Sequence, residues 1–319
     1  MSTQSNSIPD ERLQDFLAKH RLPVEFEATA REYYEPLAVF MDYYRDPGSP
    51  YLVGINGAQG TGKSTLAEFL EMAVTELYGW RSAVLSIDDF YLTRAERARL
   101  AEEVHPLFAT RGVPGTHDTA LLDQTLDTLM SLGDGEQAAL PRFDKASDDR
   151  APEDVWPVVS GPLDLILLEG WCVDSVAEDP DALREPVNDL ERFEDPDAVW
   201  RTYANQKLEE RYMPLFSRLH ALIYLAAPSF DAILTWRLEQ EHKLAERVGG
   251  QGTRIMSDEE VARFIRYYER ITRHNLRRMP RRANAVLTLA EDHSVTGCSL
   301  QQGEEWIKRY RPEVLEQSD

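Results

Sequence analysis

The chain has 319 residues, which is enough for one large α/β domain with extensions and a sizeable core. Its 56 acidic residues outnumber the 35 basic ones and give a formal net charge of −21 at pH 7, which repels polyanions and argues against nucleic acid or a membrane surface as a partner. The two cysteines form neither a disulfide framework nor a metal spacing, no apolar run is long enough to span a membrane, and residues 1–10 lack the regions of a signal peptide, so we expect a cytoplasmic protein.

Residues 1–50 are predicted to form a helical extension that packs on the rest of the chain, residues 51–319. Apolar residues recur at helical spacing between Leu13 and Met41, and a segment rich in Pro and Gly at 47–50 ends the pattern. An aromatic stripe of this kind is more often part of a hydrophobic core than of a binding site. We therefore assign the extension no chemical role.

Residues 51–77 read as a strand, a glycine-rich loop and a helix. The apolar run at 51–56 predicts a buried strand, and apolar residues recur at helical spacing from Leu66 to Leu77. The loop between them matches G-x-x-x-x-G-K-[ST] at every fixed position, and this order of elements is the context that the pattern requires. The predicted phosphate-binding residues are Gly57, Ala58, Gln59, Gly60, Thr61, Gly62, Lys63, Ser64 and Thr65.

The residue types in this loop suit a phosphate chain. Glycines lack a Cβ atom and allow the loop to wrap with its N–H groups pointing inward, which makes a nest for anions. We expect Lys63 to place its charge near the β- and γ-phosphates and Ser64 to offer its hydroxyl to Mg²⁺. The helix that follows directs the positive end of its dipole at the same phosphates.

A second apolar run, 83–87, leads directly into Asp88 and Asp89. The ligand crevice of an open parallel sheet lies just outside the carboxyl ends of its strands, so both acids are expected to face the phosphates. The competing interpretation is a helix cap followed by a surface acid. The preceding phosphate loop favours the functional interpretation of Asp88.

Two polar segments follow this strand. Residues 111–118 form a turn rich in Gly and Pro that carries Arg111, His117 and Asp118, which suggests contact with a substrate. Asp118 equally suits the N-cap of a helix over 121–132, and the physics of the sequence favours that alternative. The second segment, 140–150, has the composition of a charged surface loop.

The third strand, 163–168, ends in Glu169, where an acid can bind Mg²⁺ or orient its water molecules. Phosphate-loop enzymes ordinarily have Asp at this place. Residues 173–215 are rich in Asp, Glu and Pro and are interpreted as a mobile acidic insertion. Two further strands are predicted at 221–225 and 285–289.

Residues 230–256 are interpreted as a lid. The helix that begins near Phe230 carries Arg237, Lys243 and Arg247 and ends in a glycine-rich turn at 249–252, so its basic residues can close over a transferring phosphoryl group. A solvated basic face is the alternative for each of them. A capping box at 257–260 opens the next helix. The basic run at 277–282 receives no role.

Several segments carry a family resemblance: 57–65, 86–93, 115–118, 141–145, 149–150, 156–157, 169–171 and 256–261. With them the chain resembles the P-loop metabolite kinases of the phosphoribulokinase and uridine kinase group, and within that group D-glycerate 3-kinase and its fungal relatives. Gly-Thr-His-Asp at 115–118 and Glu-Gly-Trp at 169–171 look specific to the glycerate kinase branch. The glycine that follows Glu-Gly-Trp in the plant enzymes is replaced here by Cys172.

The resemblance implies a five-stranded parallel sheet with helices on both faces, in which the loop strand is central. It also implies that Asp88 is the general base, that Lys63 acts on the phosphates, and that Ser64 and Glu169 hold Mg²⁺. Arg237 and Arg247 are predicted to contact the nucleotide. The residues predicted to bind the acceptor are Asp89, Tyr91, Arg111, His117, Asp118, Phe143 and Arg150.

The function predicted from residues and resemblance together is direct, in-line transfer of the γ-phosphoryl group of ATP to a hydroxyl group of a small molecule. D-glycerate, giving 3-phosphoglycerate, is the favoured acceptor. One alternative is a kinase for another acceptor, such as a nucleoside or pantothenate. The other is a nucleotide-dependent switch or scaffold ATPase, which would use the same loop but needs no acid at Asp88. The sequence does not indicate an oligomeric state.

Overall fold

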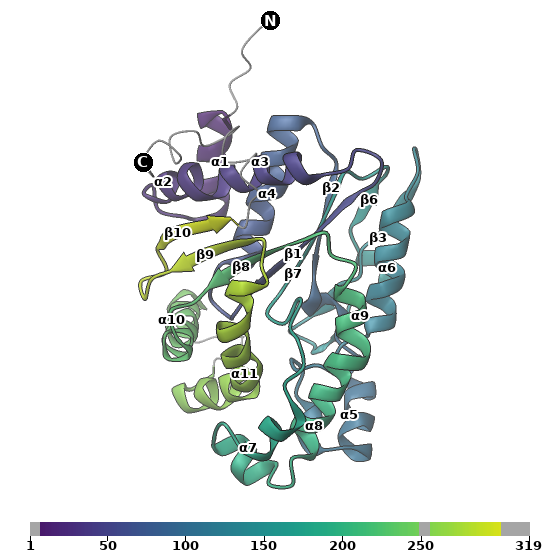
Figure 1. The fold of residues 1–319 in the computed structure, drawn as a ribbon, viewed down its shortest axis with the longest axis vertical. Coiled ribbons are helices and arrows are strands. Elements are labelled where there is room, and N and C mark those ends of the chain that lie inside the picture. The colour runs from purple at the N-terminus through teal and green to yellow at the C-terminus, as the bar shows by residue number, and fades with distance from the viewer. Residues whose placement is uncertain (1–6, 249–255, 301–319) are drawn as a thin grey trace, which may run out of the picture.

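The computed structural model describes residues 7–248 and 256–300, which form a central sheet with helices on both faces (Figure 1). The sheet has the strand order β10-β9-β8-β1-β7-β2. Five of its strands are parallel: β1 (Tyr51–Gly57), β2 (Ser82–Ser86), β7 (Leu165–Gly170), β8 (Ala221–Ala226) and β9 (Ala285–Leu289). These are the five predicted strands, and β1, which precedes the phosphate loop, is central as expected.

The prediction of five strands needs one correction. A sixth strand, β10 (Val295–Leu300), pairs antiparallel with β9, and its register shifts between Val295 and Gly297. Of its six residues only Val295 is buried. A strand at the edge of a sheet needs only one partner and little apolar surface, so this segment lacks the continuous apolar run that marks the buried strands.

Alternate residues of the central strands enter two separate cores because side chains in a strand point to opposite faces. Val53 and Ile55 of β1 belong to one core, and Leu52 belongs to the other. Both faces of the sheet are covered, which explains why the five strands read as continuous apolar runs without polar alternation.

The first core lies under the N-terminal helices and the loop helix. These elements are α1 (Asp10–His20), α2 (Phe26–Thr29), the π-helix η1 (Ala30–Tyr34), α3 (Glu35–Tyr44) and α4 (Lys63–Tyr78). Phe16 of α1 meets Phe69 of α4 edge to face, with ring centroids 5.4 Å apart. Burying one such side chain contributes about 1.5–3 kcal/mol. An exposed ion pair such as Arg12–Glu76 contributes at most about 1 kcal/mol, so apolar packing holds the extension in place.

The second core is covered mainly by elements from the middle of the chain. The α-helices of this part of the chain are α5 (Arg94–Glu103), α6 (Thr119–Ser131), α7 (Asp189–Glu194), α8 (Val199–Lys207) and α9 (Met213–Phe216). Two small hairpins pair β3 (Gln137–Ala139) with β6 (Val158–Ser160), and β4 (Phe143–Asp144) with β5 (Asp149–Arg150). The 3₁₀ turn η2 (Ile87–Phe90) follows β2 directly.

The acidic insertion at 173–215 is packed against the domain and is not a loose arm. Glu191 and Asp195 are 1% exposed, and they form ion pairs with Arg270 (2.6 Å) and Arg201 (2.9 Å), which are also buried. A buried carboxylate requires such a partner because removing its charge from water is costly. Part of the acidity of this segment therefore neutralises buried arginines.

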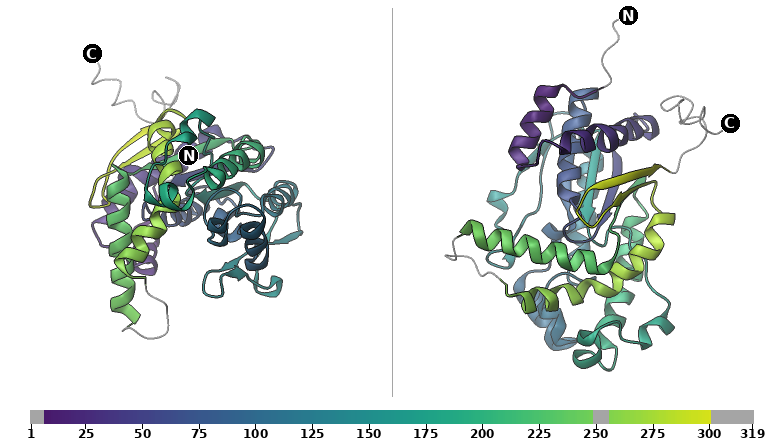
Figure 2. Two further views of the ribbon diagram at one scale, coloured as in Figure 1. Left: turned by 90° about the horizontal axis from the view of Figure 1, so that it is seen from below. Right: turned by 90° about the vertical axis from the view of Figure 1, so that its left-hand side faces the viewer.

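The segment interpreted as a lid contains α10 (Phe230–Val248), which lies beside α11 (Asp258–Arg278) (Figure 2). The predicted capping box opens α11: Ser257 Oγ accepts from Glu260 N at 3.2 Å, and Glu260 Oε2 accepts from Ser257 N at 2.9 Å. The glycine-rich turn at 249–252 lies outside the described residues. Across residues 7–248 and 256–300, no helix combines the length and the apolar character that a membrane crossing requires.

Candidate active site

The phosphate loop and two acidic strand ends meet at one edge of the sheet. The loop follows β1, and the turn η2 with Asp88 and Asp89 follows β2. Glu169 near the end of β7 lies in register with Ile55 of β1 on one side and with Ser86 of β2 on the other. The crossover connections between parallel strands thus bring three distant segments of the sequence together.

The loop has the backbone of an anion nest. Gly62 lies in the left-handed region at φ 88°, and the helix α4 begins at the next residue, Lys63. A Cβ atom at Gly57 would lie 2.5 Å from Thr61 Oγ1, so the turn is too tight for any side chain there. The first N–H groups of α4 and the positive end of its dipole lie at the end of this loop, where both favour an anion.

Lys63 lies over this loop, where its Nζ donates to Ala58 O at 3.0 Å. Burial lowers the pKa of Lys63, although the nearby Glu169 and Asp88 carboxylates oppose that change. An ammonium group that has lost part of its hydration gains more from an anion than one in bulk water does. The position and surroundings of Lys63 therefore suit a phosphate group.

Ser64 and Glu169 form a pair of oxygen ligands beside the loop. Ser64 Oγ donates to Glu169 Oε1 at 3.0 Å, and Glu169 is 6% exposed. Among the described residues there is no group of three or more His, Cys, Asp or Glu side chains arranged to hold a metal. Because Mg²⁺ typically keeps several waters and takes one or two protein oxygens together with substrate phosphates, this pair fits Mg²⁺.

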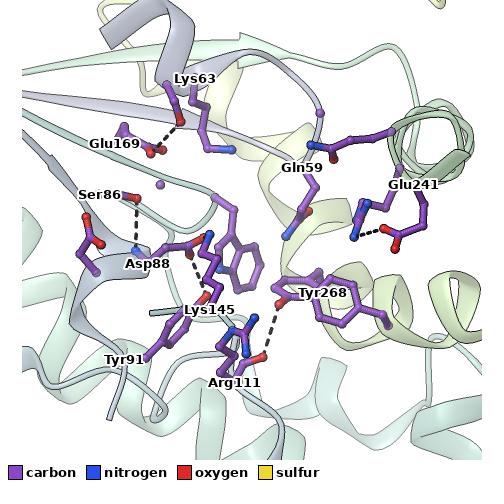
Figure 3. A pocket seen from close by; sticks show the side chains of 18 residues that line it. Gln59, Lys63, Ser86, Asp88, Tyr91, Arg111, Lys145, Glu169, Glu241 and Tyr268 are labelled. Atoms are coloured by element: carbon purple, nitrogen blue, oxygen red, sulfur yellow. Dashed lines mark hydrogen bonds and ion pairs between the residues drawn. The ribbon is translucent and has the colours of Figure 1, made fainter. Parts of the chain in front are cut away.

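A cavity of about 620 Å³ opens at this edge of the sheet (Figure 3). The predicted residues that line it are Gln59, Gly60, Lys63, Ser64, Asp88, Asp89, Tyr91, Arg111, Glu169 and Arg237. Figure 3 shows Lys63 and Glu169 at one side of the cavity, Arg111 at the opposite side and Asp88 between them. A second cavity, of about 430 Å³, shares Gly60, Lys63 and Ser64 with the first and is also lined by Thr65, Trp236, Lys243 and His293.

The Asp88 carboxylate has two partners at the cavity wall. Tyr91 donates its hydroxyl to Oδ1 at 2.7 Å, and Lys145 Nζ pairs with Oδ2 at 2.7 Å. Burial alone raises the pKa of Asp88, but the charge of Lys145 and the hydrogen bonds from Lys145 and Tyr91 outweigh it, so the net pKa is lowered. Asp88 is therefore ionised at neutral pH, as a proton acceptor must be.

Asp89 turns away to a different set of partners. Its Oδ2 pairs with Arg142 at 3.1 Å, and its Oδ1 accepts from Phe143 N at 3.2 Å. Burial raises the pKa of Asp89, and the charge of Arg142 only partly offsets this. The two adjacent acids therefore differ in role: Asp88 faces groups at the cavity, whereas Asp89 fastens the β4–β5 hairpin to η2.

Four residues predicted to bind the acceptor lie outside the lining of the large cavity: His117, Asp118, Phe143 and Arg150. Asp118 Oδ1 caps α6 by accepting from Leu121 N at 2.9 Å, and Oδ2 pairs with Arg150 at 2.8 Å. The capping interpretation of Asp118 is thus confirmed. His117 and Phe143 are 5% and 7% exposed and pack against the Tyr91 ring.

The sequence analysis did not assign several residues that line the cavity, notably Lys145 and Tyr268. Lys145 lies in the turn of the β4–β5 hairpin, within a segment that reads as a charged surface loop. Tyr268 lies on α11, and its hydroxyl donates to Arg111 O at 3.4 Å. Arg237 also lines the cavity and pairs with Glu241 at 2.7 Å, whereas the side chain of Arg247 is not among those described.

Comparison with known proteins agrees with this geometry. The chain is 35% identical over 232 residues to the uncharacterized kinase mug58 of Schizosaccharomyces pombe, and the match covers 69% of this chain and 79% of that protein. It is 32% identical over 230 residues to the chloroplastic D-glycerate 3-kinase of Arabidopsis thaliana, a match that covers 70% of this chain and 47% of the plant protein. The chain belongs to the P-loop kinase family of D-glycerate 3-kinase and its fungal relatives.

A solved structure supports the same family assignment for this P-loop kinase. The D-glycerate 3-kinase of Cryptococcus neoformans var. grubii superposes with a TM-score of 0.69 at 27% identity, and the alignment covers 87% of this chain and 99% of that one. No protein-family profile matches the chain. Its relatives are kinases, so the chain is an ATP-dependent phosphotransferase.

Proposed function

We propose that this kinase transfers the γ-phosphoryl group of ATP to a hydroxyl group of D-glycerate and so forms 3-phosphoglycerate. The observation that carries the proposal is the pair of cations that line the cavity, Arg111 and Lys145, of which Lys145 contacts Asp88. Arg111 pairs with Asp148, so an acceptor that carries a carboxylate close to its hydroxyl would give each cation a second anionic partner. The D-glycerate 3-kinases among the relatives of this chain add support.

Each side chain then has a defined task. The loop N–H groups and Lys63 bind the phosphate chain and stabilise the charge on the transferring group. Asp88 accepts the proton of the attacking hydroxyl, and no covalent enzyme intermediate is required. Ser64 and Glu169 would hold Mg²⁺, which when bound neutralises charge on the phosphates. Lys145, whose side chain is 59% exposed, is free to turn from Asp88 to the acceptor carboxylate.

A panel of acceptors tests this assignment. ADP release is measured with D-glycerate, glycerol, uridine and pantothenate, and without any acceptor. Glycerol has the same primary hydroxyl as D-glycerate but no carboxylate. We expect D-glycerate to be the best substrate and glycerol to be poor. Equal turnover on glycerol would contradict carboxylate recognition, and ADP release that no acceptor accelerates would favour the switch ATPase.

Variants at the two cations sharpen the test. Arg111→Met and Lys145→Met each lose one charged hydrogen-bonding partner of the carboxylate, so we expect the KM for D-glycerate to rise about tenfold while the KM for ATP stays the same. Arg218→Met is the matched control, because Arg218 forms its ion pairs with Asp123 and Asp127 at the surface. An unchanged KM for D-glycerate in both variants would exclude these residues from acceptor binding.

A further inference from the structure

A chain of buried aromatic side chains leads from the acidic insertion to Asp88. Tyr91, whose hydroxyl donates to Asp88, stacks its ring on the His117 imidazole with centroids 4.5 Å apart and 23° between the planes. His117 Nδ1 lies 2.8 Å from the Tyr212 hydroxyl, which also accepts from Gly115 N at 2.9 Å. Tyr212 ends the π-helix η6 (Leu208–Tyr212), and π-helical turns are frequent at functional sites.

Burial separates most of this chain from any bound molecule. Tyr91, His117 and Tyr212 are 2%, 5% and 2% exposed, and of the three only Tyr91 lines the large cavity. Burial also lowers the pKa of His117 to about 4, so its ring is neutral at physiological pH. Its Nε2 is buried and finds no hydrogen-bond partner in the described part of the chain. The imidazole therefore acts on Tyr91 through stacking and shape.

The backbone fastens the same two segments together. Tyr91 and His117 form an antiparallel bridge, Leu92 N donates to Thr116 O at 2.9 Å, and Asp118 N donates to Phe90 O at 2.6 Å. The Gly-Thr-His-Asp segment at 115–118, which the sequence analysis singled out as a possible acceptor contact, thus lies behind the turn that carries Asp88. The hydrogen bonds that the structure describes for this segment are all made with other groups of the protein.

The two partners of Asp88 differ in how firmly they are held. Lys145 belongs to a hairpin turn and its side chain is 59% exposed, whereas Tyr91 is buried between His117 and Phe143. A hydrogen bond from a fixed donor to Oδ1 restricts rotation of the carboxylate and keeps Oδ2 directed at the cavity. A general base depends on this alignment, because small misplacements of reacting groups cost large factors in rate.

We propose that His117 and Tyr212 are positioning residues for phosphoryl transfer: they hold the Tyr91 ring so that its hydroxyl fixes one oxygen of Asp88 and leaves the other for the acceptor. This inference rests on the proposed role of Asp88 as general base. It moves His117 from the predicted acceptor contacts to the wall behind Tyr91. It also gives the acidic insertion a task, since that insertion supplies Tyr212.

A double-mutant cycle tests whether His117 acts through the Tyr91 hydroxyl. His117→Ala and Tyr91→Phe are each expected to lower kcat on the order of tenfold without changing the KM for ATP, and His117→Phe, which restores a ring, recovers part of the loss. The double variant should be no slower than Tyr91→Phe alone, because residues that act through one contact are not additive. The control is Tyr224→Phe, because Tyr224 is a buried tyrosine of β8 in the same core as Tyr212.

Additive losses would overturn the proposal and leave His117 as a packing residue. If His117→Ala does not fold, Tyr212→Phe replaces it in the cycle, because that variant removes a single hydroxyl and keeps the ring. An unchanged kcat in a folded Tyr212→Phe variant would likewise contradict the proposed chain.

A carbon-13 NMR titration of Asp88 supplies a readout that needs no acceptor, with Asp88→Asn identifying the resonance. The groups that interact with this carboxylate are Lys63, Asp89, Tyr91, His117, Lys145, Cys172 and Tyr268. Removing the Tyr91 hydroxyl takes a hydrogen bond from the charged form, so the pKa of Asp88 should rise in Tyr91→Phe and also in His117→Ala. An unchanged pKa in both would refute positioning, whereas inactivity of the wild type on D-glycerate would refute only the proposed acceptor.

Discussion

The predicted phosphate end of the cavity comes from one continuous segment, residues 57–65, whereas the proposed acceptor end is assembled from the turn after β2, the loop before α6, the β4–β5 hairpin and α11. The phosphate end depends on backbone conformation, with glycines where no Cβ fits and N–H groups at the start of a helix. The acceptor end depends on side chains that meet only in the folded protein, such as Asp88 with Lys145 and Tyr268 with Arg111. A site for a group as common as phosphate can be encoded locally, but discrimination among acceptors is built from tertiary contacts.

Replacing Asp88, the first of the two adjacent acids at the acceptor end, is expected to give the largest effect. Asp88→Asn should lower kcat on D-glycerate by about 10²- to 10⁴-fold, because general-base catalysis supplies a factor of that size. Asp89→Asn should act more mildly, through the hairpin that Asp89 holds by Arg142 and Phe143. Both are measured at saturating ATP and acceptor. If Asp89→Asn were the more damaging change, the assignment of the base would be wrong.

At the phosphate end, Lys63→Ala should reduce turnover by about 10²- to 10³-fold, since one preorganised charged donor to the transferring group is lost. Lys63 gives the loop backbone one hydrogen bond, to Ala58 O, which is a small part of the stability of the fold, so circular dichroism should show a folded protein. Lys19→Ala is the control, because Lys19 pairs with Glu68 on the protein surface. Wild-type turnover in Lys63→Ala would overturn the assignment of the loop.

At the phosphate end and beside it, Ser64→Ala and Glu169→Gln test the proposed Mg²⁺ ligands. Each should raise the Mg²⁺ concentration needed for half-maximal activity about 10- to 100-fold, because groups in or next to the coordination shell contribute factors of this size. The measurement is a Mg²⁺ titration of ADP release at fixed ATP. Identical titrations for both variants and the wild type would place the metal elsewhere.

The smallest effects are expected in the predicted lid. Arg237 lines the large cavity and pairs with Glu241, whereas Lys243 lines the smaller one. At least one of Arg237→Ala, Lys243→Ala and Arg247→Ala should lower kcat several-fold with little change in the KM for ATP, if the segment closes over the phosphoryl group. Three neutral substitutions would remove the lid hypothesis.

The features that could be predicted from the sequence follow the same division between the two ends of the cavity. The phosphate loop, the five parallel strands and the capping box at Ser257 were predictable because their signals are local: glycine spacing, apolar runs and a residue pair three apart. The role of Asp118 was also predictable, since capping α6 is a short-range hydrogen bond. Edge strand β10 was missed because one-sided pairing requires little apolar surface.

The sequence by itself therefore determined the family, the five parallel strands and the strand–loop–helix unit of the predicted phosphate loop, because each of these is set by the spacing of neighbouring residues. Tertiary structure alone decided that Lys145 pairs with Asp88 across 57 positions and that His117 lies behind Tyr91. It also decided that the acids of the insertion neutralise buried arginines. Charge pairing and ring stacking act through space, and a charged residue has the same appearance in a sequence whether it is solvated or paired.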